Sequence, residues 1–169
     1  MKHSFRVATV MVAVAAGAAL VAPLASPASA ALKSTVSCKS VTSPPTSTKK
    51  PSTFANCTPA ALKAGGTGGL AKTPPPGSKK GQLGFTVTWK GAMGKTVAAV
   101  TFNVLPAAKR GNCKAGTARV TIVGTVKSGT GKVAKIIKNG EPVSAATCVV
   151  TSGTKAGQSS LAPGTAFKL

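Results

Sequence analysis

Alternation of apolar and polar side chains is clearest over residues 83–105, and it predicts a β-hairpin. In the first run Phe85, Val87 and Trp89 share one face of an extended chain, while threonines occupy the other face. A period of two residues is typical of a strand with one buried face. A glycine-containing turn follows, and the second run repeats the pattern at Ala98, Val100, Phe102 and Val104.

Shorter alternating runs flank this hairpin at residues 32–41, 119–126, 143–150 and 165–169. Glycine and proline residues separate them, and no convincing long helix is present. Seven or eight short antiparallel strands of this kind predict an all-β fold. The fold is expected to be either an Ig-like β-sandwich or a small closed barrel.

Residues 132–138 have two interpretations. Lysine recurs at every third position, which would place Val133, Ile136 and Ile137 on the opposite side of a helix. The segment has the length of a strand, however, and it ends at Asn-Gly, the preferred two-residue hairpin turn. We therefore expect a strand here.

The segment before the hairpin, residues 31–82, is rich in Ser, Thr, Pro and Gly, and residues 83–169 are the expected β-sandwich core. Within the first segment, residues 64–81 contain two glycine pairs and three consecutive prolines. A phosphate-binding loop would need a closing Gly-Lys-Ser/Thr element, which is missing. We interpret residues 64–81 as a linker.

Residues 1–30 have the features of a secretory signal helix that is cleaved from the mature chain. A basic start precedes an apolar run over residues 7–21, and Ala28-Ser29-Ala30 is a suitable cleavage site. The alternative is a retained membrane anchor, because residues 7–24 are nearly long enough to span a bilayer. Prolines and the cleavage site favour the signal. The expected location is secreted, extracellular or associated with the cell wall, with no membrane span after cleavage.

Four cysteines in an exported chain predict two disulfides. Three pairings are possible, and we favour Cys38 with Cys57 and Cys113 with Cys148 because each closes a local segment. The competing interpretation is a zinc site, but the chain has no Cys-x-x-Cys motif and no histidine after residue 30. No metal or cofactor is predicted.

The chain is strongly cationic. Of 22 basic residues, only Lys2 and Arg6 precede the cleavage site, so the mature chain carries 20 against a single acid, Glu141, and has a net charge of +19. Such a charge attracts polyanions, and the dominance of lysine over arginine indicates diffuse attraction. The alternative is that these lysines only keep the sheet soluble. The candidate anion-binding residues are Lys79, Lys80, Lys109, Arg110, Lys114, Lys132, Lys135 and Lys138.

Catalytic chemistry has few residues available in the mature chain, which has no His, Asp or Tyr. Catalytic triads, paired carboxylates and carboxylate metal sites are therefore absent from it. Glu141 falls in an Asn-Gly-Glu-Pro turn, where we expect it to be solvated. Composition alone does not exclude a Ser-Lys pair. We predict that the protein is not an enzyme and has no catalytic residues.

Aromatic residues are few. Trp89 is expected in the core, and a ligand-stacking platform is the alternative. Single-strand nucleic-acid grooves combine basic residues with several exposed aromatics, so sequence-specific nucleic-acid binding is not expected. Nonspecific attraction to DNA, teichoic acid or anionic lipid remains compatible with the charge.

Several short motifs occur in one order along the chain: Gly-Gly-Thr-Gly-Gly at 65–69, Thr-Val-Thr-Trp-Lys-Gly at 86–91, Gly-Lys-Thr at 94–96, Asn-Cys-Lys-Ala-Gly at 112–116, Val-Ser-Ala-Ala-Thr-Cys-Val at 143–149 and the ending Ser-Leu-Ala-Pro-Gly-Thr-Ala-Phe-Lys-Leu. With a cysteine pair around a polar loop, this order resembles a family of small secreted actinobacterial proteins without assigned function. The resemblance implies export and a disulfide-bonded β fold, and it supplies no active-site residues. The high lysine content departs from more neutral members.

These features lead to one main functional hypothesis and two others. The first is a secreted, non-enzymatic basic β protein that associates with anionic cell-envelope or extracellular polymers. The second is a protease inhibitor that presents Lys109-Arg110 from the disulfide-flanked loop at residues 106–117. A weak enzyme or an antimicrobial protein is the third.

Overall fold

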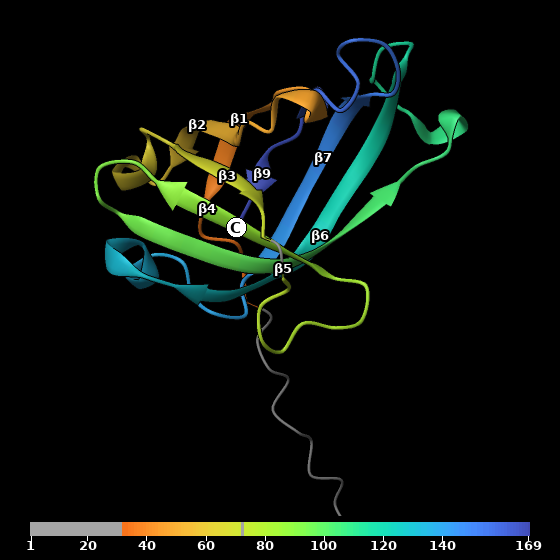
Figure 1. Cartoon of the computed structure of the whole chain (residues 1–169). Helices are drawn as coiled ribbons and strands as arrows, with labels where there is room; N and C mark the ends of the chain where they lie inside the picture. The colour runs from red at the N-terminus through yellow and green to blue at the C-terminus, as the bar shows by residue number, and fades with distance from the viewer. Residues whose placement is uncertain (1–31, 72) are drawn as a thin grey trace, which may run out of the picture. The chain divides into compact units, whose positions relative to one another are not determined.

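In the part of the chain that the structure describes, nine strands form one antiparallel sheet that closes into a barrel (Figure 1). The computed structural model describes residues 32–71 and 73–169, so the predicted signal helix lies outside the described residues. The strands are β1 (Ser37–Ser43), β2 (Ser52–Thr58), β3 (Gly66–Leu70), β4 (Leu83–Trp89), β5 (Gly94–Val104), β6 (Thr117–Gly129), β7 (Pro142–Val150), β8 (Ser159–Leu161) and β9 (Phe167–Lys168). The all-β prediction is confirmed, and of the two expected architectures the structure has the closed barrel.

Strands that are consecutive in the sequence pair with each other from β1 to β8. Closure takes place between β7 and β1, where β8 and β9 share one strand position. β8 pairs with Thr42 and Ser43 of β1, whereas β9 pairs with Ser37 and Cys38 of the same strand. Both short strands also pair with β7. The barrel therefore has eight strand positions, one of them divided between two strands.

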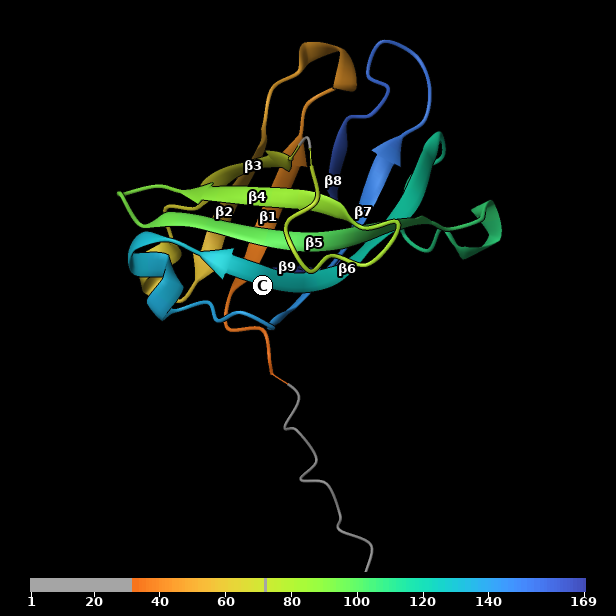
Figure 2. The same ribbon diagram turned by 60° about the horizontal axis from the view of Figure 1, so that its bottom comes forward.

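Because the strands are antiparallel, their connections alternate between two ends of the barrel. The mouth end carries the β1–β2, β5–β6 and β7–β8 connections, and Thr46 N donates to Ala156 O (3.2 Å) between the first and the last of these. The plug end carries the β2–β3, β4–β5 and β6–β7 connections. In Figure 2 the β1–β2 and β7–β8 connections stand side by side at the top, and the helix of the β6–β7 connection lies at the lower left.

Apolar side chains fill the plug end. Leu62 from the short helix η2 (Ala60–Leu62) is 1% exposed, and Val133 and Ile137 from the β6–β7 connection are 0% and 1% exposed. Trp89 is also buried here, and its Nε1 donates to Thr96 Oγ1 at 2.9 Å. The prediction that Trp89 belongs to the core is confirmed.

The prediction of a strand at residues 132–138 is wrong. Gly131–Lys135 form a 3₁₀ helix, η4, and a turn follows it. The helical spacing allows Val133 and Ile137 to face the barrel interior together, and burial of these two side chains outweighs the strand-like length of the segment.

The linker expected at residues 64–81 is wrong in part, because Gly66–Leu70 are the barrel strand β3, paired with β2 and β4. Glycine is required on its inner face. A Cβ on Gly66 would meet the carbonyl oxygen of Thr88, and a Cβ on Gly68 would lie 2.6 Å from Phe54 Cε2. The missing side chains allow close approach of a neighbouring backbone and of an aromatic ring.

The substitution Gly66→Ala is expected to lower the free energy of unfolding by about 1–3 kcal/mol, because its Cβ would push against backbone atoms of β4. Gly69→Ala in the same strand is the matched control, since its Cβ would meet nothing within 4 Å. The control is expected to change stability by less than about 0.5 kcal/mol. Urea unfolding of both variants measures the difference, and equal losses would contradict this account of β3.

Candidate functional site

The single acidic side chain of the sequence is buried at the plug end. Glu141 is 1% exposed, and its carboxylate accepts hydrogen bonds from Thr35 N (2.9 Å), Thr35 Oγ1 (2.8 Å) and Lys138 N (2.7 Å). The expectation of a solvated Glu141 is wrong, because the segment before β1 packs onto the turn that contains it. The carboxylate connects these two segments.

With Glu141 buried, the charged side chains on the described exterior are all basic. Among the described residues no lysine or arginine forms an ion pair, and no acidic side chain reaches the surface. A carboxylate held by three structural hydrogen bonds is also not placed to act as a general base on an external substrate.

The predicted anion-binding residues lie at separate places on the barrel. All are exposed except Arg110, which is half-buried. Three are on the β5–β6 connection at the mouth end (Lys109, Arg110, Lys114), three are at the plug end (Lys132, Lys135, Lys138), and two are on the β3–β4 connection (Lys79, Lys80). That last connection lies against the outer wall, where Lys127 Nζ donates to Gly77 O at 2.8 Å. The structure does not bring the set together into one patch.

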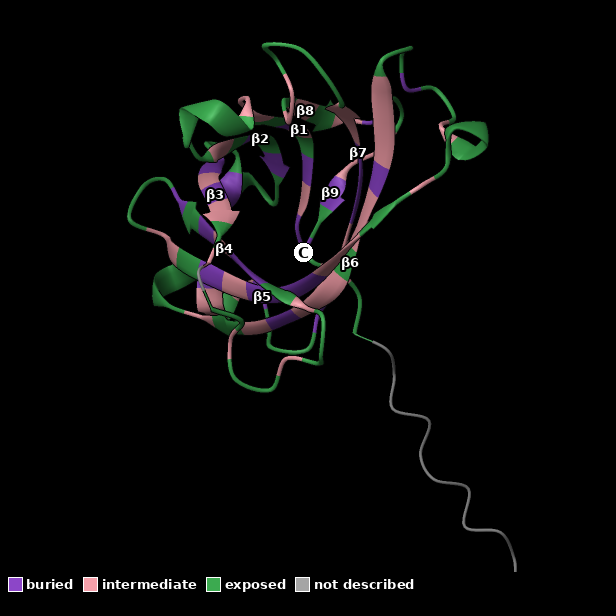
Figure 3. Ribbon diagram, turned by 45° about the vertical axis from the view of Figure 1, so that its right-hand side comes forward, coloured by how far each residue is buried: buried purple, intermediate pink, exposed green. Residues whose placement is uncertain are grey.

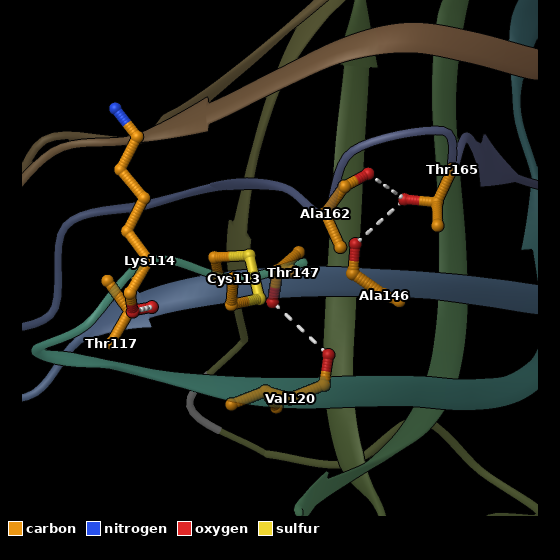
Figure 4. Close-up of a disulfide and its surroundings, with 9 residues drawn as sticks. Cys113, Lys114, Thr117, Val120, Ala146, Thr147, Ala162 and Thr165 are labelled. Atoms are coloured by element: carbon orange, nitrogen blue, oxygen red, sulfur yellow. Dashed lines mark hydrogen bonds between the residues drawn. A yellow bond between two sulfur atoms is a disulfide. The ribbon is translucent and has the colours of Figure 1, made fainter. Parts of the chain in front are cut away.

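Both predicted disulfides are confirmed. Cys38 and Cys57 join directly opposed positions of β1 and β2. Cys113 and Cys148 join the β5–β6 connection to β7, with Cα atoms 5.5 Å apart. Figure 4 shows this second bond beside Lys114, so it holds the basic connection against the barrel. Two disulfides are characteristic of proteins that fold in an oxidising compartment.

The mouth end, in contrast to the plug end, is hollow. A cavity of about 420 Å³ opens there, and Figure 3 shows how the strands surround a single interior. Its floor consists of Phe54, Phe85 and Phe167, whose ring centroids are 4.9–6.0 Å apart. Its apolar walls come from several strands and include Val41, Phe102, Val120, Ile122 and Val149.

The rim of this cavity is formed largely by the β1–β2 connection. Lys49 and Lys50 line it together with Pro44, Pro45 and Pro51. The sequence analysis did not select these two lysines, and it did not detect the cavity. The only local signal was the polar, proline-rich composition of the connection, because the phenylalanines of the floor come from three distant strands.

The polar side chains that line the cavity are those of serines, threonines and lysines. Thr147 is the buried polar side chain of its wall, and its hydroxyl donates to Val120 O at 3.4 Å, as Figure 4 shows. Nowhere in residues 32–71 and 73–169 do three His, Cys, Asp or Glu side chains gather as a metal site would require. No helix in the same ranges is long and apolar enough to cross a membrane.

Comparison with known proteins adds no relatives: no protein-family model, curated protein or solved structure matches this chain. The resemblance to small secreted actinobacterial proteins stays a prediction.

Glu141→Gln is expected to lower the free energy of unfolding by about 2 kcal/mol. The amide NH₂ of glutamine would face a backbone N–H whose hydrogen bond the carboxylate now accepts, so two donors would meet. Lys138→Gln is the control, since it keeps the backbone N–H that binds Glu141, and it is expected to change stability by less than about 0.5 kcal/mol. Chemical unfolding compares the two variants. A Gln variant as stable as the parent would show that the carboxylate does not hold the N-terminal segment.

Proposed function

We propose that this protein is a secreted, non-enzymatic basic β protein that associates with anionic polymers of the cell envelope or its surroundings. One observation carries the proposal: the mature chain has 20 basic residues, and its single acid is buried in hydrogen bonds to its own backbone. The described exterior therefore has no acidic side chain to offset its lysines. Long-range attraction to a polyanion is the expected physical result.

The distribution of the lysines supports diffuse association. Basic residues lie at the mouth end, at the plug end and on the outer wall, so a flexible polymer can contact them from many directions. Lysine is a point charge that does not read phosphate or carboxylate in a fixed geometry. Binding of this kind is strongly weakened by salt, because it depends on release of counterions from the polymer.

The protease-inhibitor alternative stays a prediction. Lys109 ends the 3₁₀ helix η3 (Ala107–Lys109), and Arg110 has helical backbone angles (φ −61°, ψ −27°). Proteases bind their substrates in extended form, so the backbone at Lys109-Arg110 does not favour this alternative over polymer association. Absence of trypsin inhibition at micromolar concentrations of the protein would rule out the protease-inhibitor alternative.

Retention on a heparin column tests the proposal. We expect strong retention at low salt and elution as salt rises, with a similarly earlier elution for two triple variants: Lys109→Gln/Arg110→Gln/Lys114→Gln at the mouth end and Lys132→Gln/Lys135→Gln/Lys138→Gln at the plug end. Each variant loses three positive charges. Each lost contact makes the negative slope of log affinity against log salt shallower by about 0.7–0.9. The two variants are matched controls for each other.

Two results would contradict the proposal. The protein could pass through the column at low salt, which would mean that its charge serves solubility alone. One triple variant could lose all retention while the other keeps it, which would indicate a single shaped site.

A further inference from the structure

We propose that the mouth cavity binds a small amphipathic anion, with a hydrocarbon body inside the barrel and one carboxylate, sulfate or phosphate head group at Lys49 and Lys50. This site is separate from polymer association, because a polymer without an apolar body has nothing to insert into the barrel. The two proposals stand on different residues and fail in different experiments.

The size and lining of the cavity fit a ligand of this kind. Its volume of about 420 Å³ lies in the range of 300–1,000 Å³ that is typical of small-molecule pockets. The interior of an eight-stranded barrel is either filled by side chains or able to hold one small ligand. Here the plug end is filled, and the mouth end is open above the rings of Phe54, Phe85 and Phe167.

Four of the five hydroxyl groups that line the cavity already form hydrogen bonds within the protein, which argues for a hydrocarbon body. The hydroxyl of Thr147 donates to Val120 O, and the hydroxyls of Ser43 and Ser52 at the rim bond to each other at 2.7 Å. A ligand with polar atoms along its body would leave them without partners, and this costs binding free energy.

Apolar surface at the opening is exposed to water in the free protein. Leu70 lines the cavity and is 60% exposed, although it pairs with the buried Phe85 and shares its inward face. Burial of this surface against a hydrocarbon ligand would be favourable. An exposed large apolar side chain of this kind is a common mark of a ligand-binding groove when it belongs to a larger apolar opening.

The rim supplies charge of one sign. Lys49 and Lys50 line the opening, and no acidic side chain lies anywhere on the described surface. An anionic head group at this position would gain charge-assisted hydrogen bonds from the ammonium groups, whereas a cationic head group would be repelled. This sign difference is what makes the proposed ligand an anion.

The rim is also held in place before any ligand binds. Thr46 N donates to Ala156 O at 3.2 Å, which joins the β1–β2 connection to the neighbouring β7–β8 connection. Prolines precede and follow the two lysines, and they restrict the backbone of this connection. A rim ordered in advance loses less conformational entropy on binding.

Isothermal titration calorimetry with decanoate tests the proposal. We expect one decanoate per protein, and binding at least tenfold weaker for decyltrimethylammonium, which has the same chain and the opposite charge. Acetate, which has the head group without the chain, is expected not to bind detectably. Equal affinity for the anionic and cationic amphiphiles would overturn the proposal.

Lysine substitutions locate the head group. Lys49→Gln/Lys50→Gln is expected to weaken decanoate binding about tenfold. The matched control is Lys132→Gln/Lys135→Gln, which removes the same charge at the plug end and is expected to leave affinity within about twofold. Equal weakening by both pairs would show that net charge attracts the anion without a rim site, and would overturn the proposal.

A filling substitution locates the hydrocarbon body. Ile122→Trp replaces an aliphatic side chain of the cavity wall with a larger indole ring, and it is expected to abolish decanoate binding in a protein that keeps its circular dichroism and unfolding temperature. Leu70→Glu is a second variant for the case that Ile122→Trp does not fold. It adds a negative charge at an exposed position of the opening and is expected to weaken binding more than Leu70→Lys does. Unchanged binding in folded Ile122→Trp, or equal effects of the two Leu70 variants, would overturn the proposal.

Discussion

Closure of the sheet between β7 and β1 is the constraint on which the rest of the structure depends. Two short strands, β8 and β9, fill the gap, and reciprocal hydrogen bonds between Val36 and Leu169 (2.8 and 3.0 Å) continue the pairing beyond β9. A closed sheet has no edge with unpaired backbone groups. Closure also gives every strand an inside and an outside, and this separates the apolar side chains from the charged ones.

The two ends of the barrel differ because different side chains meet there. At the plug end Leu62, Val133 and Ile137 fill the interior, and the carboxylate of Glu141 holds the segment before β1 by accepting hydrogen bonds from it. At the mouth end the short helix η1 (Thr46–Thr48) contributes no buried side chain, and the aromatic floor lies below an apolar hollow. The hollow mouth thus follows from this packing, since the apolar filling is concentrated at one end, and burial of the acid leaves only basic charged side chains on the described exterior.

The central hairpin and both disulfides could be predicted because their signals are local: strict alternation in one case and short cysteine separations in the other. β3 could not, since glycines carry no side chain to reveal a period, and only the neighbouring backbone and the Phe54 ring explain them. The alternation also fails in β2, where Phe54 and Cys57 are both buried although they are three residues apart. Asn56 between them has a positive φ of 54°, which turns the chain.

By itself, the sequence determined that this protein is cationic, rich in short strands, able to form two local disulfides and poor in catalytic side chains, because composition and alternation are properties of the chain alone. Only the tertiary structure decided that the sheet closes, that Glu141 is buried, and that Lys49 and Lys50 border an apolar opening. These outcomes depend on contacts between distant residues, such as Thr35 and Glu141, which are 106 positions apart. A local pattern carries no information about which remote segment will cover it.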